Sequence, residues 1–440
     1  MIYRIYPPEE LIENGSLTMP YSKSMLNRAL MLAALTPGAK FPPELPAGED
    51  CRDVYVMQTA LELLLKASKG EETRLNLGES GTALRFLTAF CAARPGVNAI
   101  LDGDPGLRRR PVKIFVDALR QLGAEIGYLG EEGFAPLKIE GRQLSGGALT
   151  IDPTVSSQYI SALMLVAPTM SAPLKISFDG EPSSLPYIRM TAEMMRRQGA
   201  GVDLAPLSVE VETGGYVPRE QPIEGDWSGA AFWLEVGALT AGWISLRNLP
   251  LPKESIQGDA RAAEFFECLG VVTNPGEDED ENPIEGAVSL TPSPEVYGRL
   301  DLDLADYPDL APALTVTCCM LGVPFRFVGL HSLAIKESDR LQALVEEMER
   351  VGVQIQKIRD FGLEWEGKRH TILTMPVFDP RGDHRLAMAL APVAAYIPGI
   401  LLRDPECVAK SYPGYWDALR SLGFTAGEYQ PEKDPEKDPE

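Results

Sequence analysis

Residues 75–92 read LNLGESGTALRFLTAFCA and show, in one stretch, the pattern that organises the whole chain. A short strand-like segment, Leu75-Asn76-Leu77, runs into the turn 78–82, and an apolar helix follows from Ala83 to Ala92. The helix carries apolar residues on nearly every side, which is typical of a helix that is buried all round. The stretch therefore predicts a strand, a polar turn and a buried helix.

The same pattern occurs six times, and the starts are spaced by roughly sixty to eighty residues, which indicates internal repetition. The six units cover residues 17–35, 75–92, 149–166, 223–239, 302–321 and 377–395. A chain of 440 residues exceeds one ordinary core, so the six units favour two α/β domains with three units each. Helix starts carry unpaired N–H groups and a positive dipole end, so converging starts would bind an anion.

The composition excludes several classes of protein. The chain has 41 Lys plus Arg against 63 Asp plus Glu, and this net charge of -22 disfavours nucleic acid and anionic membranes as partners. Pro7 and Pro8 interrupt the N-terminal segment, which predicts no signal peptide, and no uncharged apolar run reaches transmembrane length. Six cysteines without a C-x-x-C pair and three distant histidines predict reduced thiols and no metal site. We therefore expect a cytoplasmic protein without a metal.

Cationic residues recur at the predicted turns, and some lie inside apolar helices. Arg28 and Arg85 are flanked by apolar residues, and a buried arginine needs an anionic partner because it keeps its proton. Taken singly, each cation is more often a surface charge. Together they favour a small, multiply charged anion, such as a phosphorylated carboxylate, as the ligand. The cations at or beside the turns are Lys23, Arg28, Arg85, Arg110, Lys336, Arg340, Arg385 and Lys410.

The stretch 335–341, IKESDRL, carries the densest charge in an apolar setting. Lys336 and Arg340 lie four residues apart in a predicted helix, where like charges on one face repel unless an anion lies over them. Glu337 lies between them and is a candidate general acid or base. The alternative is a solvated helix face on which both cations pair with neighbouring acidic residues.

Polar turn residues supply further candidates. Ser156-Ser157-Gln158 opens a helix, and one serine can serve as N-cap while the others are available for phosphate or hydroxyl recognition. Gly81 allows close approach of a ligand, or alternatively a turn with positive φ. Asp309 follows Pro308 at the head of an apolar helix, where it would face the helix dipole or act as a base. The sequence has no dinucleotide fingerprint, P-loop or nucleophile elbow, so nucleotide cofactors and acyl-serine chemistry are unsupported.

A series of short strings, in this order, resembles the EPSP synthase (3-phosphoshikimate 1-carboxyvinyltransferase) family of enolpyruvyl transferases along nearly the whole chain. Each string is weak alone, but the ordered set is specific. The strings are Ser22-Lys23-Ser24, Asn27-Arg28-Ala29-Leu30, Gly81-Thr82-Ala83 with Arg85, Arg110-Pro111, Val155-Ser156-Ser157-Gln158, Pro186-Tyr187-Ile188, Glu224-Gly225-Asp226, Gln257-Gly258-Asp259, Lys336-Glu337-Ser338-Asp339-Arg340, Asp383-His384-Arg385-Leu386-Ala387-Met388 and Ala409-Lys410.

The resemblance implies two domains, each an inside-out α/β barrel of three repeated folding units with buried parallel helices, which close on substrate like a clamp. Residues 18–224 would form the N-terminal domain on the shikimate 3-phosphate side. Residues 1–17 and 225–427 would form the C-terminal domain. Residues 428–440, where Pro-Glu-Lys-Asp repeats, would be a disordered acidic tail.

The resemblance also implies a reaction: transfer of the enolpyruvyl group of phosphoenolpyruvate to the 5-hydroxyl of shikimate 3-phosphate, with release of phosphate. This is a step of the shikimate pathway of aromatic amino acid biosynthesis, and it implies a monomer that needs no cofactor. By the same resemblance, Asp309 would be the base on the 5-hydroxyl and Glu337 the acid that protonates the methylene carbon. Lys336 would contact both substrates and the hydroxyl, and Lys23 would be catalytic too.

The remaining site residues implied by the resemblance bind the substrates. Those for shikimate 3-phosphate would be Ser24, Arg28, Ser156, Ser157, Ser184 and Tyr187. Those for phosphoenolpyruvate would be Lys23, Gly81, Arg110, Arg340, Arg385 and Lys410, with Gln158 between the two substrates.

Four departures from the family pattern leave alternatives open. Tyr21 stands where glycine is usual, Glu79 where asparagine is usual, and Ser332 where some members have asparagine. The segment 41–53 is short, so strands of the first unit are expected to be missing. One alternative is a non-catalytic anion-binding relative that keeps the fold and the cations but has lost turnover through Tyr21 and Glu79. The other is the sister enolpyruvyl transferase acting on UDP-N-acetylglucosamine, whose loop cysteine has no evident match here.

Overall fold

The computed structural model describes residues 1–43, 51–152, 156–277, 282–372 and 374–430. The chain forms two compact units. Unit 1 consists of Met1–Pro20, Gly225–Ser255 and Asp259–Glu440, and unit 2 of Tyr21–Glu224 and Ile256–Gly258. Most of the predicted acidic tail, residues 431–440, lies outside the described residues, whereas Glu428 ends strand β20 (Thr425–Glu428).

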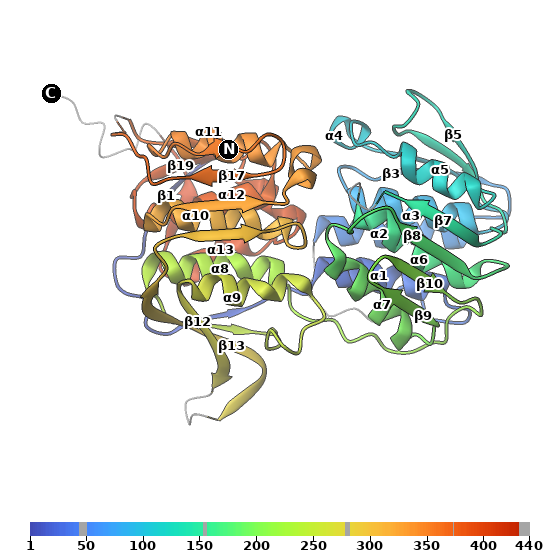
Figure 1. Ribbon diagram of the computed structural model, residues 1–440, viewed down its shortest axis with the longest axis horizontal. Helices are drawn as coiled ribbons and strands as arrows, with labels where there is room; N and C mark the ends of the chain where they lie inside the picture. The colour runs from blue at the N-terminus through green and yellow to red at the C-terminus, as the bar shows by residue number, and fades with distance from the viewer. Residues whose placement is uncertain (44–50, 153–155, 278–281, 373, 431–440) are drawn as a thin grey trace. The chain divides into compact units, whose positions relative to one another are not determined.

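Three helices form the centre of unit 2: α1 (Lys23–Leu35), α3 (Gly81–Ala93) and α6 (Ser157–Val166). Each is buried along most of its length and contacts the other two. The unit also contains α2 (Arg52–Lys66), α4 (Pro105–Arg108), α5 (Lys113–Gln121) and α7 (Leu185–Arg197). Figure 1 shows the strands of this unit along the outer side of the stacked helices.

Two four-stranded sheets flank these helices. The first has the order β3-β4-β6-β5 and the second the order β7-β8-β10-β9. In each sheet the first pair is parallel and the next two pairs are antiparallel. The strands are β3 (Glu72–Asn76), β4 (Asn98–Asp102), β5 (Glu125–Tyr128), β6 (Leu137–Glu140), β7 (Gly147–Ile151), β8 (Leu174–Phe178), β9 (Val202–Ala205) and β10 (Ser208–Val211).

Unit 1 repeats this arrangement with three sheets, ordered β12-β13-β11-β2, β14-β15-β17-β16 and β18-β19-β1-β20. Each again has one parallel pair and two antiparallel pairs, with the parallel pair at the β2 end of the first sheet. The strands are β1 (Ile2–Tyr6), β2 (Gly15–Thr18), β11 (Ile244–Arg247), β12 (Leu269–Glu277), β13 (Pro283–Val296), β14 (Leu300–Asp303), β15 (Phe325–Val328), β16 (Gln356–Lys357), β17 (Leu363–Trp365), β18 (Val377–Phe378), β19 (Ile400–Arg403) and β20.

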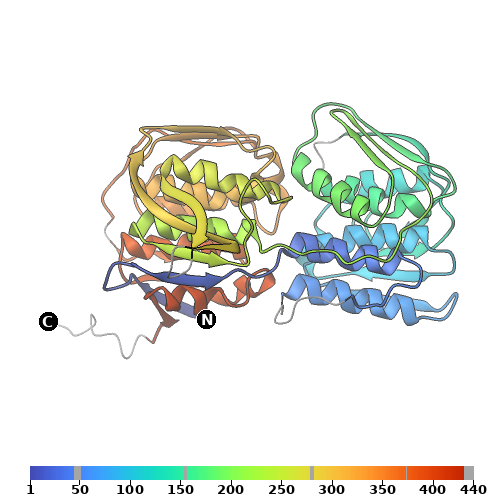
Figure 2. The ribbon, with the colours of Figure 1, turned by 90° about the horizontal axis from the view of Figure 1, so that it is seen from below.

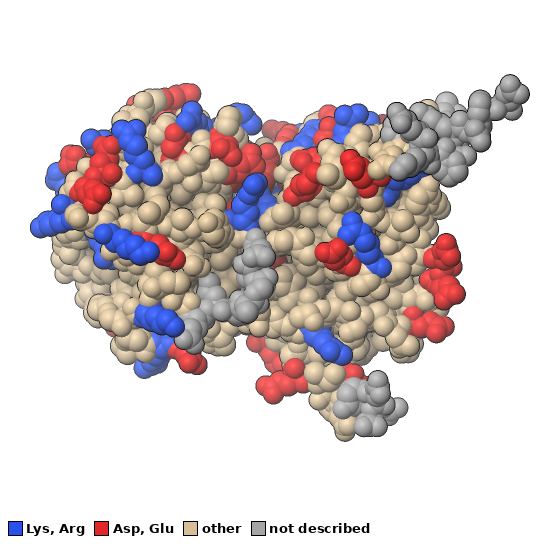
Figure 3. Space-filling model, turned by 180° about the vertical axis from the view of Figure 1, so that it is seen from behind, with Lys and Arg blue, Asp and Glu red and all other residues tan. Residues whose placement is uncertain are grey.

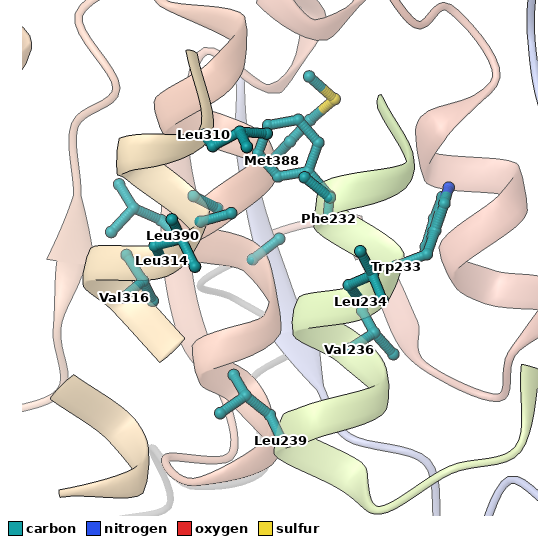
Figure 4. Packing of buried hydrophobic residues seen from close by; sticks show 14 of the residues in the cluster. Phe232, Trp233, Leu234, Val236, Leu239, Leu310, Leu314, Val316, Met388 and Leu390 are labelled. Atoms are coloured by element: carbon teal, nitrogen blue, oxygen red, sulfur yellow. The ribbon is translucent and has the colours of Figure 1, made fainter. Parts of the chain in front are cut away.

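The core of unit 1 is built on α8 (Trp227–Thr240), α10 (Ala311–Leu321) and α12 (His384–Leu390), which pack on one another. Figure 4 shows the ring of Phe232 from α8 beside Met388 from α12 and Leu310, which directly precedes α10. Shorter helices, α9 (Ala262–Glu267), α11 (Arg340–Glu349) and α13 (Tyr415–Ser421), complete the unit. Figure 2 shows the unit from below, with strands outside its helices. The predicted mixed α/β class is confirmed.

The strand and the helix of the first predicted repeat do not lie in the same unit. The strand predicted at Leu17 to lead into the helix at Lys23 is β2, and it pairs in parallel with β11 of unit 1. The helix that follows, α1, lies in unit 2. The chain therefore changes units between β2 and α1, and the residues that would carry further strands of this repeat fall partly in 44–50, outside the described residues.

The surface of the described residues mixes both signs of charge. Figure 3 shows Lys and Arg interspersed with Asp and Glu on the face seen from behind. Among the described residues, no helix has both the length and the apolar character needed to cross a membrane.

Glu235 is an acidic residue in the middle of the apolar helix α8. Its side chain is fully buried, and neither carboxyl oxygen has a hydrogen-bond partner among the described residues. Burial therefore raises the pKa of Glu235 well above its usual value. The folded protein keeps this proton at pH values where the unfolded chain loses it, so stability falls as pH rises from about 4.5 toward the raised pKa.

We expect Glu235→Gln to remove this pH dependence. Between pH 5 and pH 7 the wild type should lose unfolding free energy relative to the variant, by up to about 1.4 kcal/mol for each pH unit below the raised pKa. Urea unfolding at both pH values measures the difference, with Glu267→Gln at an exposed helix end as the matched control. Parallel pH dependence in the wild type and Glu235→Gln would show that the carboxyl is ionised at both pH values.

Candidate active site

Arg340 is the centre of a charged cluster in unit 1. Its side chain is 1% exposed. Nε and Nη2 donate to the two carboxylate oxygens of Asp383 at 2.7 and 3.2 Å. Nη1 donates to Oδ1 of Asp309 at 2.9 Å, and Nη2 also donates to Oε2 of Glu337 at 3.0 Å. One planar guanidinium thus fixes three carboxylates, which a lysine at this position could not do.

Three further cations lie next to the carboxylates of Asp309 and Glu337. Nζ of Lys410 lies 2.9 Å from Oε1 of Glu337, and Nη2 of Arg385 lies 3.1 Å from Oδ2 of Asp309. Nζ of Lys336 lies 3.7 Å from Oδ1 of Asp309. These four cations and three carboxylates form a largely buried ionic cluster, in which the cations are available to an anion that displaces a carboxylate.

The environment shifts the pKa values within this cluster. Burial alone would raise the pKa of Asp309, but the charges of Arg385, Lys336 and Arg340 hold it well below its usual range. Asp309 is therefore ionised, as a proton acceptor must be. Burial lowers the pKa of Lys336, although Asp309 opposes this effect. Burial would also lower the pKa of Arg340, but its three carboxylate partners raise it.

The prediction that Lys336 and Arg340 share a helix face is wrong. Helix α11 begins at Arg340, and Asp339 is its N-cap, accepting from the backbone N–H of Gln342 at 3.0 Å. Lys336 follows the 3₁₀ helix His331–Ile335 instead. The alternative of a solvated pair is also wrong for Arg340, because its side chain is buried. The two cations nevertheless contact the same carboxylate oxygen of Asp309.

Arg28 is a buried cation of unit 2 whose hydrogen-bond acceptors among the described residues are all neutral oxygens, and its guanidinium also lies over the rings of Phe86 and Tyr187. Nε donates to the Thr191 hydroxyl at 2.7 Å, and Nη1 donates to the Ser24 carbonyl at 2.8 Å. Nη2 donates to the Ser161 hydroxyl at 3.3 Å and to the Tyr187 carbonyl at 3.4 Å. Burial lowers the pKa of Arg28 to about 10. A guanidinium desolvated in this way favours an incoming anion.

Two more guanidinium groups converge at Gly81, the first residue of α3. A Cβ placed on Gly81 would lie 2.6 Å from Nη1 of Arg110 and would also contact Nη1 of Arg85. Both arginines are buried. The backbone φ of Gly81 is not positive, so the close approach of the two guanidinium groups, and not a turn, is what the missing side chain allows here.

The other predicted residues of unit 2 lie at helix starts. Ser156 is the N-cap of α6, accepting from the Gln158 backbone N–H at 3.3 Å, and the Gln158 side chain donates to the Thr82 hydroxyl at 3.1 Å. Ser157 is the first residue of α6, and Ser184 precedes α7 with a left-handed φ of 56°. The N–H groups and dipoles of these helices favour negative charge.

Sequence reasoning missed two partners of the predicted site residues. Asp53 pairs with Lys23 at 3.1 Å, and Asp383 is completely buried against Arg340. Asp383 was detectable as an aspartate placed before an apolar helix, where it accepts from the Arg385 N–H at 3.0 Å as N-cap. Asp53 gave no such signal, because its partner lies 30 residues away.

Two of the departures from the family pattern, Glu79 and Tyr21, lie in unit 2, whereas Ser332 lies in the 3₁₀ helix His331–Ile335 of unit 1. Oε1 of Glu79 lies 2.8 Å from where a Cβ on Gly106 would be, and Nη2 of Arg109 lies 3.9 Å from the same point. The carboxylate therefore points toward α4. Tyr21 is partly buried against the core of unit 2. The predicted site residues thus form two groups, one within each unit.

Comparison with known proteins gives a consistent result. The model of the family described as EPSP synthase (3-phosphoshikimate 1-carboxyvinyltransferase) matches residues 10–419. The 3-phosphoshikimate 1-carboxyvinyltransferase of Bacteroides fragilis is 40% identical over 425 residues, covering 96% of this chain and 98% of the relative. That of Colwellia psychrerythraea is 32% identical, covering 93% and 97%. A structure of EPSP synthase from Acinetobacter baumannii has a TM-score of 0.73 and 22% identity, covering 97% of this chain and all of that one, and it supports the fold.

Proposed function

Because this chain belongs to the EPSP synthase family, we propose that it transfers the enolpyruvyl group of phosphoenolpyruvate to the 5-hydroxyl of shikimate 3-phosphate and releases phosphate. The family resemblance inferred from the sequence strings is confirmed by the match over residues 10–419. The function places the chain in the shikimate pathway of aromatic amino acid biosynthesis.

The observation that carries this proposal is the pair of carboxylates joined by one guanidinium. Asp309 and Glu337 accept from different nitrogens of Arg340, at 2.9 and 3.0 Å. Addition to an enol ether requires a proton donor at one carbon and a nucleophile at its neighbour, so two separately held carboxyl groups match the chemistry. The surrounding cations would stabilise the phosphate and carboxylate of phosphoenolpyruvate.

The proposed roles follow from this arrangement. The 5-hydroxyl oxygen bonds to C2 of phosphoenolpyruvate while its proton passes to Asp309, and Glu337 gives a proton to the methylene carbon C3. The tetrahedral product then loses a proton from the new methyl group to Glu337, and the C2–O bond breaks as the departing phosphate takes the proton held by Asp309. Lys336 and Lys23 neutralise charge as it moves between these groups. Arg340, Arg385 and Lys410 hold phosphoenolpyruvate together with Gly81 and Arg110.

Residues of unit 2 are proposed to hold shikimate 3-phosphate. The support is the buried Arg28 without a carboxylate partner among the described residues, and the helix starts that present Ser156, Ser157 and Ser184. Ser24 and Tyr187 supply the carbonyls that orient Arg28. Gln158 is proposed to contact both substrates.

The domain division, the barrel architecture, the cellular location and the oligomeric state are also proposals. The two units would be the two domains of the family, residues 18–224 and residues 1–17 with 225–427, each an inside-out barrel of three repeated folding units. The repeated set of one parallel and two antiparallel strand pairs, found in three sheets of unit 1 and two sheets of the described part of unit 2, supports the repetition. The protein would act as a cytoplasmic monomer on two small-molecule substrates.

Gly81→Ala tests the assignment of the phosphoenolpyruvate residues. The added methyl group would displace the guanidinium groups of Arg85 and Arg110, so we expect the KM for phosphoenolpyruvate to rise about tenfold or more. The KM for shikimate 3-phosphate should change much less. Steady-state kinetics with each substrate varied in turn measures both, and Gly298→Ala, where a Cβ meets nothing within 4 Å, is the control. Equal rises in both KM values would contradict the assignment.

Phosphate release from shikimate 3-phosphate plus phosphoenolpyruvate tests the function itself. Wild type should release phosphate, and Lys23→Met should release it far more slowly, whereas Lys66→Met, which removes an exposed lysine, should match wild type. Release with UDP-N-acetylglucosamine in place of shikimate 3-phosphate would favour the sister transferase. Binding of shikimate 3-phosphate without any release would favour the non-catalytic relative.

A further inference from the structure

Glu347 is a buried carboxylate of helix α11 that the proposed reaction does not use. Its side chain is fully buried, and Oε2 accepts from Nε of Arg350 at 2.8 Å and from the Asp379 backbone N–H at 2.9 Å. Nη2 of Arg381 lies 3.8 Å from Oε1. Burial raises the pKa of Glu347, and these three partners oppose the shift. A carboxylate at this position is therefore unfavourable unless these contacts stabilise it.

Two of the partners, Asp379 and Arg381, belong to the turn 379–383, which joins strand β18 to helix α12. Arg381 has a left-handed φ of 56°, which is unfavourable for arginine, so neighbouring contacts must hold the turn in this shape. Oδ1 of Asp379 accepts from the Arg381 N–H at 2.9 Å. The Pro380 carbonyl accepts from the Asp383 N–H, also at 2.9 Å. The buried carboxylate of α11 supplies a further contact from outside the turn.

The last residue of the turn is attached to the same helix. Asp383 is completely buried and accepts from Nε and Nη2 of Arg340, the first residue of α11. Arg340 and Glu347 lie seven residues apart on one face of this helix, about 10 Å along its axis. Helix α11 thus holds the turn at both ends, with a carboxylate at Asp379 and a guanidinium at Asp383.

The turn leads directly to Arg385, which is proposed to hold phosphoenolpyruvate. Asp383 is the N-cap of α12 and accepts from the Arg385 backbone N–H at 3.0 Å. The guanidinium of Arg385 reaches Oδ2 of Asp309 at 3.1 Å. Because Asp383 contacts both the Arg385 backbone and the Arg340 side chain, a shift of the turn would displace two of the proposed anion-binding arginines together.

We propose that Glu347 is a positioning residue, which fixes the turn 379–383 and thereby sets Arg385 for binding of phosphoenolpyruvate. The proposal deepens the proposed function and rests on it. Glu347 acts through Asp379 and Asp383, so it neither gives a proton to the substrates nor takes one from them. Its loss should impair binding of phosphoenolpyruvate selectively, because the turn belongs to unit 1 and the residues proposed for shikimate 3-phosphate belong to unit 2.

Steady-state kinetics of phosphate release, with each substrate varied in turn, tests this role. In Glu347→Leu the Asp379 N–H loses its acceptor, so we expect the KM for phosphoenolpyruvate to rise about tenfold or more and the KM for shikimate 3-phosphate to change less than about twofold. Glu347→Gln keeps an oxygen that can accept from this N–H, so both KM values should stay within about threefold of wild type. Glu349→Leu, which removes a half-exposed carboxylate from the same helix, should match wild type. A smaller folded fraction would lower kcat and leave both KM values unchanged.

Amide hydrogen exchange, read by mass spectrometry on a peptide that covers residues 377–386, reports the state of the turn without turnover. Exchange should be faster in Glu347→Leu than in wild type, and close to wild type in Glu347→Gln. Asp379→Ala protects the test against misfolding of Glu347→Leu, because Asp379 is only partly buried and its carboxylate holds the Arg381 N–H. This variant should show the same faster exchange and the same selective rise in the KM for phosphoenolpyruvate.

The outcomes separate this proposal from the proposed function. If wild type releases phosphate but exchange in the turn is unchanged in Glu347→Leu, the positioning role is overturned and the transferase stands. The same holds if exchange becomes faster in Glu347→Leu and Asp379→Ala without a selective rise in the KM for phosphoenolpyruvate. If wild type releases no phosphate, the proposed function fails and the positioning role fails with it, whereas the exchange data still show whether Glu347 holds the turn.

Discussion

Replacing Glu337 with glutamine is expected to lower kcat for phosphate release by roughly 10²- to 10⁴-fold, the range typical of a lost general acid. The amide keeps the shape of the side chain, and its oxygen can still accept from Arg340 or Lys410. It cannot, however, deliver a proton to the methylene carbon of phosphoenolpyruvate. Wild type in deuterated water should also incorporate deuterium at that carbon during the reaction, and Glu337→Gln should not.

The matched control for this variant is Glu346→Gln in helix α11. Glu346 pairs with the side chain of Arg381 on the surface, and its carboxylate is about half exposed. Its replacement should leave kcat and deuterium incorporation unchanged. If Glu337→Gln retained more than a tenth of wild-type kcat, another group would have to supply the proton, and Glu337 would be left as a partner of Arg340 and Lys410.

Arg340→Lys is expected to reduce both activity and stability. A lysine keeps the charge but cannot contact Asp383, Asp309 and Glu337 together, so at least one buried carboxylate loses its partner. Breaking a buried ion pair in this way costs about 3–5 kcal/mol, which urea unfolding would detect. We expect kcat/KM to fall at least 10²-fold as well, because Asp309 and Glu337 lose their common anchor.

Arg326→Lys is the control for this substitution, because Arg326 is about half exposed and lies 3.8 Å from its carboxylate partner Glu364 on the surface. Its replacement should change stability by less than about 1 kcal/mol. An Arg340→Lys variant as stable and active as this control would mean that the three carboxylates do not depend on one guanidinium.

The sequence predicted much of the local structure, because turns and buried helices depend on neighbouring residues. The run from Ala83 to Ala92 lies within helix α3, which is buried along nearly all its length. The prediction failed where partners are distant. Asp383 lies 43 residues from Arg340, and nothing in the local pattern identifies that pair. The same limit applies to β2, whose partner β11 is more than 200 residues away.

For the candidate site too, features that depend on neighbouring residues were predicted and others were not. Buried arginines and polar helix starts were predictable from residue type and apolar surroundings, and Arg28 and Arg85 are buried in the structure. The error at Lys336 has a physical cause. The prediction continued the helix from Arg340 toward the N-terminus as far as Lys336. The side chain of Asp339 instead caps the helix, so the helix begins at Arg340.

The pairing of β1 has a consequence for synthesis of the chain on the ribosome. β1, near the N-terminus, pairs on one side with β19 and on the other with β20. Strand β1 therefore has no partner strand until the ribosome has synthesised β19, in which Ile400 pairs with Ile5. At about 5–20 residues per second, the nearly 400 intervening residues take on the order of 20–80 s to make. Unit 2 is contained almost entirely in residues 21–224 and can acquire its core during that interval. The nascent N-terminal strand must stay unpaired throughout, which makes it the natural point for a chaperone to act or for a misfolded dimer to begin.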